Sequence, residues 1–127
     1  NSNDIHIASL NTYLKKKEFT NMKKWVSQNM DNDPIDIMRK IYDNVYTVLE
    51  PKTIPEAVLI IAEYQYKSAF VVDQEINMVA FLTEIMMRCA YEKMITSEKL
   101  LKIYITVRKK THKYKPTRKH YNVHLYG

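Results

Sequence analysis

Apolar residues recur at three- and four-residue intervals along most of the chain, the spacing that places them on one face of an α-helix. The pattern is clearest in the segment that follows Pro34, where the apolar positions are Met38, Ile41, Tyr42, Val45 and Leu49. The spacing predicts an all-α fold, a compact bundle of five to six helices. The predicted helices span residues 4–17, 19–30, 34–50, 54–70 and 74–93, with a sixth from about residue 97.

Polar residues at the expected starts of these helices support the boundaries. Asp33 precedes a proline that suits a first helical turn, and Asp73 precedes the fifth helix, so each aspartate is expected to cap a helix N-terminus. Thr53 and Glu56 have the spacing of a capping box. Asn3 or Asp4 is expected to cap the first helix, which should end at a run of lysines.

The fourth and fifth helices are the most apolar. On the fourth, apolar residues line one side and others widen the apolar surface, which predicts burial on more than one side. That side comprises Val58, Ile61, Ala62, Tyr66 and Ala69, widened by Leu59 and Ile60. The fifth helix is apolar on most faces and is predicted to be the central one.

The C-terminal part of the chain allows two interpretations. A sixth helix is favoured from Ser97, but β-branched and aromatic residues at 103–107 would also fit extended structure. From Arg108 onward we expect a tail that is either poorly ordered or pinned by an external partner. The predicted domains are therefore residues 1–93, a helical bundle, and residues 94–127, a basic extension.

The count of glycine narrows the possible functions. Gly127 is the only glycine among the 127 residues. A Walker loop and a dinucleotide-binding loop both require glycines, so neither can be built here. The single cysteine, Cys89, excludes an internal disulfide and a thiolate zinc cluster, and its apolar neighbours predict a core position. The longest apolar run, residues 57–62, is far shorter than the ~20 residues of a membrane span, so we expect a soluble protein with no membrane partner.

Charge is divided unevenly between the two predicted domains. The chain carries a net charge of +6, yet residues 1–98 hold 11 Lys and Arg against 14 Asp and Glu, a net charge of −3. Residues 99–127 hold nine Lys and Arg and no acid. The basic character therefore belongs to the C-terminal end.

One stretch of helical sequence resembles a known family. The segment from Ile54 to Glu92 is similar to the C-terminal helical domain of the ATPase subunit of T4-like bacteriophage sliding-clamp loaders. The strongest pieces are Ala62-Glu63-Tyr64-Gln65-Tyr66 and Asp73-Gln74-Glu75-Ile76-Asn77. The resemblance covers residues 4–93 and implies no role for residues 94–127, because family members end shortly after the fifth helix.

The resemblance implies a collar domain, the part of the subunit that holds the assembly together. In that family the N-terminal part is an AAA+ ATPase with Walker motifs, and none of these motifs occurs here. We therefore expect a non-catalytic domain without cofactors, since ATP and magnesium belong to the ATPase domain. The implied partners are other clamp-loader subunits, including copies of the same chain. The sliding clamp and primer-template DNA would be reached only through the full assembly, in the cytoplasm of an infected bacterium.

The candidate interface residues lie at the junction between the fourth and fifth helices. They are Tyr64, Gln65, Tyr66, Asp73, Gln74 and Glu75. The alternative is that the tyrosines are core residues with satisfied hydroxyls and that Asp73 is only a cap.

The basic end offers a second possible function, that of a nucleic-acid-binding adaptor. Its cations could contact phosphates, and tyrosines between them could stack on bases. The candidate contacts are Arg108, Lys109, Lys110, Lys113, Lys115, Arg118 and Lys119. A metal site from His112, His120 and His124 is disfavoured, because no carboxylate lies in the tail and Pro116 interrupts the segment.

Overall fold

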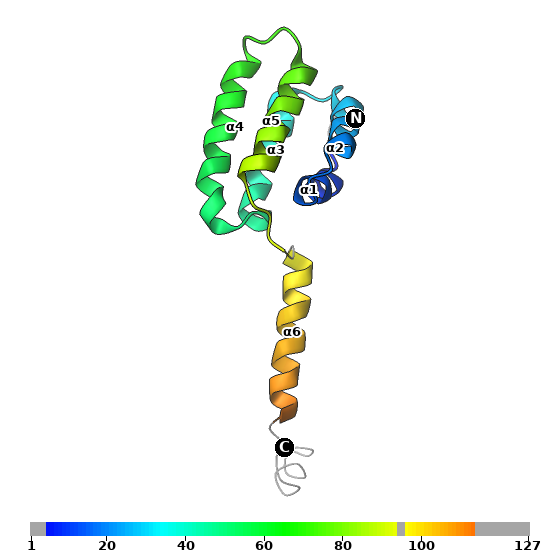
Figure 1. Ribbon diagram of the computed structural model, residues 1–127, viewed down its shortest axis with the longest axis vertical. Coiled ribbons are helices and arrows are strands. Elements are labelled where there is room, and N and C mark those ends of the chain that lie inside the picture. Colours follow the sequence, from blue (N-terminus) through cyan, green and yellow to red (C-terminus); the bar gives the residue numbers. More distant parts are fainter. Residues whose placement is uncertain (1–4, 94–95, 114–127) are drawn as a thin grey trace, which may run out of the picture. The chain divides into compact units, whose positions relative to one another are not determined.

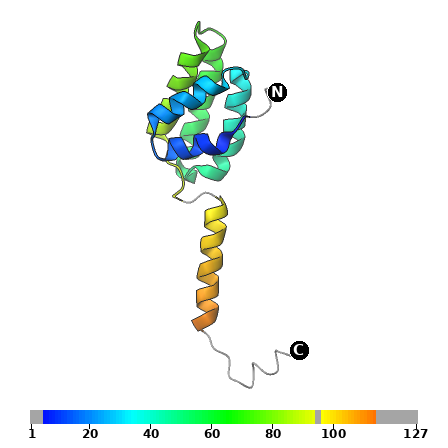
Figure 2. The same cartoon turned by 90° about the vertical axis from the view of Figure 1, so that its right-hand side faces the viewer.

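Helices make up all the regular structure that the computed structural model describes, over residues 5–93 and 96–113 (Figures 1 and 2). They are α1 (Ile7–Lys15), α2 (Phe19–Asn29), α3 (Pro34–Val48), the 3-10 turn η1 (Pro51–Thr53), α4 (Ile54–Ser68), α5 (Gln74–Arg88) and α6 (Thr96–Lys113). The predicted all-α class is confirmed. The chain divides into two units, Asn1–Lys93 and Met94–Gly127, which are described separately below.

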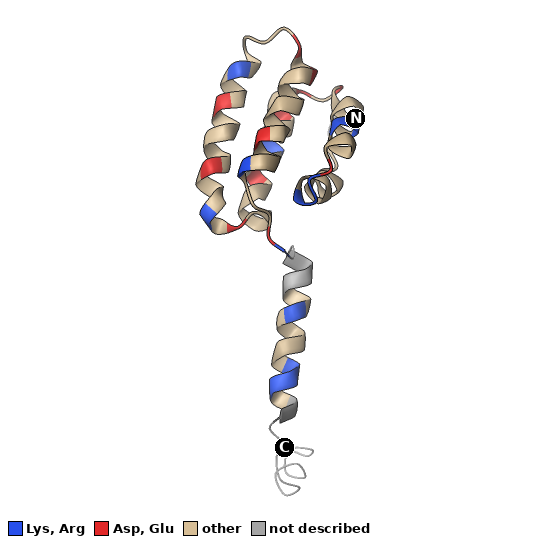
Figure 3. Cartoon of the chain, in the orientation of Figure 1, with Lys and Arg blue, Asp and Glu red and all other residues tan. Residues whose placement is uncertain are grey.

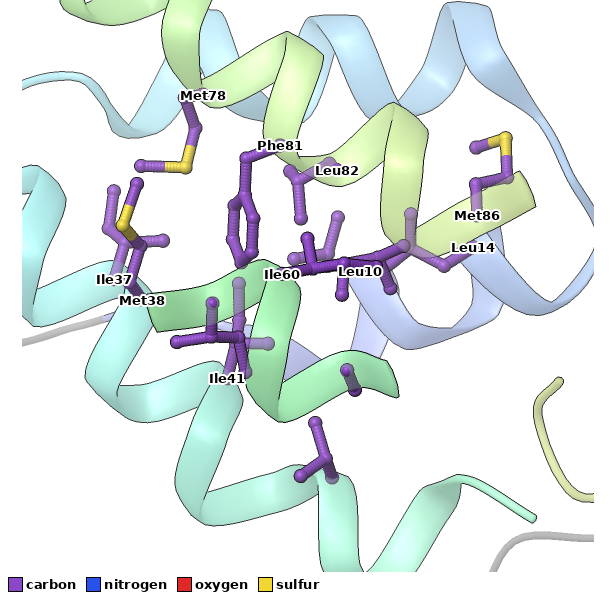
Figure 4. Packing of buried hydrophobic residues seen from close by; sticks show 14 of the residues in the cluster. Leu10, Leu14, Ile37, Met38, Ile41, Ile60, Met78, Phe81, Leu82 and Met86 are labelled. Carbon is purple, nitrogen blue, oxygen red and sulfur yellow. The ribbon is translucent and has the colours of Figure 1, made fainter. Parts of the chain in front are cut away.

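The centre of the first unit is α5, as predicted. It packs against α4, α2 and α1, while α3 packs against α4 and α1. Figure 4 shows Phe81 of α5 pointing toward α4 and Ile60, with Met78 and Leu82 beside it. The largest fully buried side chains are Phe81, Leu10, Leu14, Met22, Ile37, Met38, Leu49, Met78, Leu82, Ile85, Val26 and Val45. One apolar core therefore joins the five helices.

Two aspartates cap helices as the sequence predicts. The Asp33 side chain accepts from the backbone N–H of Ile35 at 2.9 Å, and the Asp73 side chain accepts from that of Ile76 at 3.1 Å. The first helix differs, because it begins at Ile7 and its N-cap, His6, makes no side-chain capping bond. A cap by Asn3 or Asp4 lies outside the described residues.

The turn between α1 and α2 closes without glycine. Lys17 adopts a left-handed backbone conformation with a φ of 58°. Among the non-glycine residues that the structure describes, it alone has a positive φ. The Lys17 N–H donates to the Leu14 carbonyl at 3.2 Å and the Glu18 N–H donates to the Tyr13 carbonyl at 2.8 Å, the paired bonds of a Schellman motif. The Lys17 ammonium also donates to the Met86 carbonyl of α5 at 2.6 Å.

The fifth helix ends at Arg88, five residues before the predicted end at Lys93. The following segment is extended and pairs with the end of α3. Glu50 N donates to the Ala90 carbonyl and Glu92 N donates to the Val48 carbonyl, both at 2.8 Å. These bonds to a distant segment replace the helical bonds, which is why the helix stops early.

The predicted capping box at Thr53 is wrong. Thr53 makes no side-chain capping bond, and its backbone is already helical. Its hydroxyl donates to the Glu50 carbonyl at 2.9 Å and accepts from the Ala90 N–H at 3.3 Å. Glu56 instead pairs with Arg88 of α5 at 3.3 Å. The threonine therefore fastens the extended segment to η1 rather than starting α4.

The described part of the second unit is α6. Its helical form settles the choice between helix and extended structure at residues 103–107. The helix continues past Arg108 to Lys113, so the predicted start of the tail at Arg108 is too early. Residues 114–127 lie outside the described part of the chain.

Candidate assembly surface on α4

Two opposite sides of α4 are apolar. The side toward α3 and α5 carries the buried residues Ala57, Ile60, Ile61 and Tyr64. At 3.6 residues per turn, a second set falls about half a turn away from these residues. This exposed face, called the α4 outer face below, comprises Leu59, Ala62 and Tyr66 of α4 together with Ala69 and Phe70 of the turn that follows the helix.

The α4 outer face holds three large apolar side chains in water. Leu59 is 68%, Tyr66 70% and Phe70 69% exposed. The rings of Tyr66 and Phe70 pack on each other with centroids 5.0 Å apart, so they form one aromatic ridge. Ala62 and Ala69, which have small side chains, are also exposed on this face. Small residues next to large ones suit the docking of another helix.

The sequence-based assignment of the α4 faces is largely wrong. Of the five residues that line the predicted apolar side, only Ile61 is buried, whereas Ala62, Tyr66 and Ala69 lie exposed. Within residues 5–93, the predicted burial of α4 on more than one side is also wrong. The physical reason is that both sides of α4 are apolar, so helical spacing alone cannot distinguish the side that α3 and α5 cover.

Tyr64 belongs to the core and not to an outward surface. It is 6% exposed, and its ring lies 5.6 Å from that of Phe81. Its hydroxyl donates to Glu84 Oε1 of α5 at 2.5 Å. Burial, followed by this hydrogen bond to a carboxylate, raises the pKa of Tyr64 to about 12. The alternative of a core tyrosine with a satisfied hydroxyl is therefore the one that the structure shows.

The remaining polar candidates are engaged within the bundle. Asp73 caps α5, and Gln74 Nε2 donates to the Ser68 carbonyl at 2.8 Å. Glu75 accepts from Ser27 Oγ of α2 at 2.9 Å. Gln65 is half-buried. Of the six candidates, Tyr66 alone lies on the α4 outer face, and the sequence reasoning missed its neighbours Leu59 and Phe70 as surface residues.

Neither an activated cysteine nor a metal-binding cluster occurs among the residues that the structure describes. Cys89 is 5% exposed, and burial, together with the Glu56 carboxylate, raises the pKa of its thiol to about 11, which disfavours a nucleophilic thiolate at neutral pH. Within residues 5–93 and 96–113, no three His, Cys, Asp or Glu side chains gather into a possible metal site. No helix in that part of the chain is long and apolar enough to cross a membrane.

The basic candidates are distributed over α6 and the segment beyond it. Arg108, Lys109 and Lys110 are exposed on α6. Lys113 ends the helix, and Lys115, Arg118 and Lys119 lie outside the described residues, as do His120 and His124. In Figure 3, every charged residue coloured on the described part of α6 is Lys or Arg.

Comparison with known proteins adds no identification. No protein-family model matches the chain, and no curated protein matches it either.

Proposed function

We propose that residues 5–93 form a subunit-assembly domain and that the α4 outer face is part of the contact between subunits. The observation that carries the proposal is a helix with two apolar sides, of which residues 5–93 cover only one. Fully burying a side chain such as Leu59 or Phe70 contributes about 1.5–3 kcal/mol. A partner that covers Leu59, Tyr66 and Phe70 would therefore gain from removing three large apolar side chains from water, as one part of a larger contact.

The resemblance to clamp-loader collars gives this domain a specific setting. We propose that it belongs to a DNA polymerase sliding-clamp loader acting in bacteriophage DNA replication, that it is non-catalytic, and that its partners are like subunits arranged in a ring. A ring requires a head-to-tail contact, so the α4 outer face would meet a different surface of its neighbour. A two-fold dimer would place α4 against α4. The mass of the assembly distinguishes these two arrangements.

The test uses two tyrosines of similar exposure on different helices. Tyr66 on the α4 outer face pairs with Phe70, and Tyr46 on α3, 55% exposed, pairs with Tyr42. Light scattering with size-exclusion chromatography is measured on the full chain and on a truncation ending at Lys93. We expect a defined oligomer from both, dissociated by Tyr66→Ser and retained in Tyr46→Ser.

Two outcomes would contradict the α4 contact. One is a truncation that stays monomeric at every concentration. The other is an oligomer that Tyr46→Ser weakens as much as Tyr66→Ser, because the loss would then come from general destabilisation. Thermal unfolding of both variants, followed by circular dichroism, shows whether each bundle remains folded.

A further inference from the structure

The sixth helix presents a second exposed apolar face, on the other unit of the chain. Leu100, Ile103, Tyr104 and Val107 follow the helical spacing of one face, and Leu101 and Ile105 widen it. All six side chains are exposed, from 42% for Ile105 to 62% for Leu100. A helix of 18 residues rich in β-branched residues has little stability in water by itself, so an apolar surface that covers this face would favour the helix.

The opposite side of α6 is positively charged. At 3.6 residues per turn, Lys102 and Lys109 fall opposite Leu100 and Tyr104, and Lys110 lies at the border. Arg108 lies on the apolar side, where its Nη1 donates to the Tyr104 hydroxyl at 3.2 Å. The sequence has no acid from Lys99 to Gly127. The helix is therefore amphipathic and basic, and it should be attracted to an anionic surface.

Three kinds of partner for α6 can be compared by the side chains that each would cover. Nucleic acid would satisfy the cations but leave six large apolar side chains in water. A second copy of α6 would cover a narrow seam, leave Leu101 and Ile105 outside it, and bring two positively charged helices together. An anionic lipid surface accepts a wide apolar face between its acyl chains and also attracts the cations.

We propose that α6 lies on an anionic membrane surface, with Leu100, Ile103 and Val107 between the acyl chains and its lysines toward the lipid phosphates. Tyr104 and Arg108 suit the headgroup level, since each has an apolar body and a polar end. The sequence-based expectation of no membrane partner rested on the absence of a spanning segment. Peripheral binding needs no such segment, and it is independent of the assembly function proposed for residues 5–93.

The experiment measures co-sedimentation of the full chain with vesicles. One preparation contains phosphatidylcholine alone, and the other contains equal parts phosphatidylcholine and phosphatidylglycerol. We expect binding to the anionic vesicles that weakens as salt rises. In the double variant Ile103→Gln, Val107→Gln the affinity should fall at least about tenfold, because two apolar side chains lose their burial. Thr106→Gln, an exposed position outside the apolar face, is the matched control and should bind like the parent chain.

Several results would overturn the proposal. Failure to bind anionic vesicles would do so, and so would equal binding by the double variant, because adsorption would then depend on charge alone. Tighter binding to duplex DNA than to the vesicles would assign the basic side to nucleic acid. A dimer formed without lipid that the double variant dissociates would assign the apolar face to a second copy. The substitutions lie outside residues 5–93, so unfolding of the bundle is an internal control for each preparation.

Discussion

Tyr64 and Tyr66 lie two residues apart on α4 and occupy opposite environments. Tyr64 is 6% exposed and bonded to Glu84 of α5, whereas Tyr66 is 70% exposed and packs on Phe70. At 100° per residue, a two-residue step carries a side chain to the other side of the helix. The same residue type therefore serves the core at one position and the proposed assembly surface at the other.

Removing the two hydroxyl groups should have different consequences. Tyr64→Phe leaves the Glu84 carboxylate without its donor, and a hydrogen bond to a charged group contributes about 1.5–3 kcal/mol. Glu84 keeps its pairing with Arg88 at 3.3 Å, so we expect a loss near the lower end, about 1.5 kcal/mol. Tyr66→Phe is the control and should change stability by less than about 0.5 kcal/mol. Urea unfolding measures both, and equal effects would contradict the Tyr64–Glu84 contact.

Alkaline pH should weaken the fold partly through Tyr64. Its pKa is raised from 10.0 to about 12 in the folded chain, chiefly by burial and then by Glu84. Between these values the unfolded chain has released the proton and the folded chain still holds it. The stabilisation is therefore complete below pH 10 and is lost as pH rises toward 12. Tyr64→Phe should make this decline shallower in urea unfolding measured at several pH values, and an unchanged slope would contradict the assignment.

Local signals in the sequence predicted the helices well. Asp33 and Asp73 cap the helices that they were expected to cap, because such a cap needs only a side-chain oxygen and N–H groups two or three residues away. The buried stripe of α3 was also predictable, since most of the exposed positions of this helix are polar. Trp25 of α2 is 4% exposed, and its Nε1 donates to the His6 carbonyl at 2.9 Å.

Features that depend on distant residues were not predictable. The hydroxyl of Thr53 contacts Ala90, 37 residues away, and the local sequence contains no pattern that predicts this contact. The end of α5 likewise depends on backbone hydrogen bonds between the segment that follows it and the distant end of α3. The α4 outer face was missed for a related reason, because an apolar residue such as Leu59 or Phe70 fits a core as well as a surface. Only the positions of α3 and α5 decide between them.

Cys89 should react slowly with thiol reagents in the folded chain. It is the only cysteine, it is buried, and its pKa is raised from 9.0 to about 11. Because the thiolate is the reactive form, iodoacetamide at neutral pH should modify the native chain at least about tenfold more slowly than the urea-unfolded chain. Mass spectrometry follows the single adduct over time. Equal rates for native and unfolded chains would show that this thiol is accessible.

The left-handed backbone at Lys17 should carry a measurable cost. An L-residue in this conformation is less stable than glycine by about 1 kcal/mol. Lys17→Gly alone would confuse two effects, because it also removes the bond to the Met86 carbonyl. Lys17→Ala removes the same bond but keeps Cβ. We therefore expect Lys17→Gly to be more stable than Lys17→Ala by about 1 kcal/mol in urea unfolding. If alanine is equal to or better than glycine, the left-handed turn at Lys17 is refuted.

Thr53 should matter through its hydroxyl and not through a capping box. Thr53→Ala leaves the Ala90 N–H without its acceptor in a half-buried position, which costs about 1–3 kcal/mol. Thr53→Ser keeps the hydroxyl and should retain most of the stability. Glu56→Gln removes only an exposed ion pair with Arg88, worth less than about 1 kcal/mol. In a capping box, Thr53 and Glu56 would support the same helix start, and Glu56→Gln would lose much of its effect once Thr53 is alanine. We instead expect the two substitutions to act additively on the free energy of unfolding. The Thr53 hydroxyl bonds to the segment 89–91, whereas the Glu56 carboxylate pairs with α5, so the two contacts are separate.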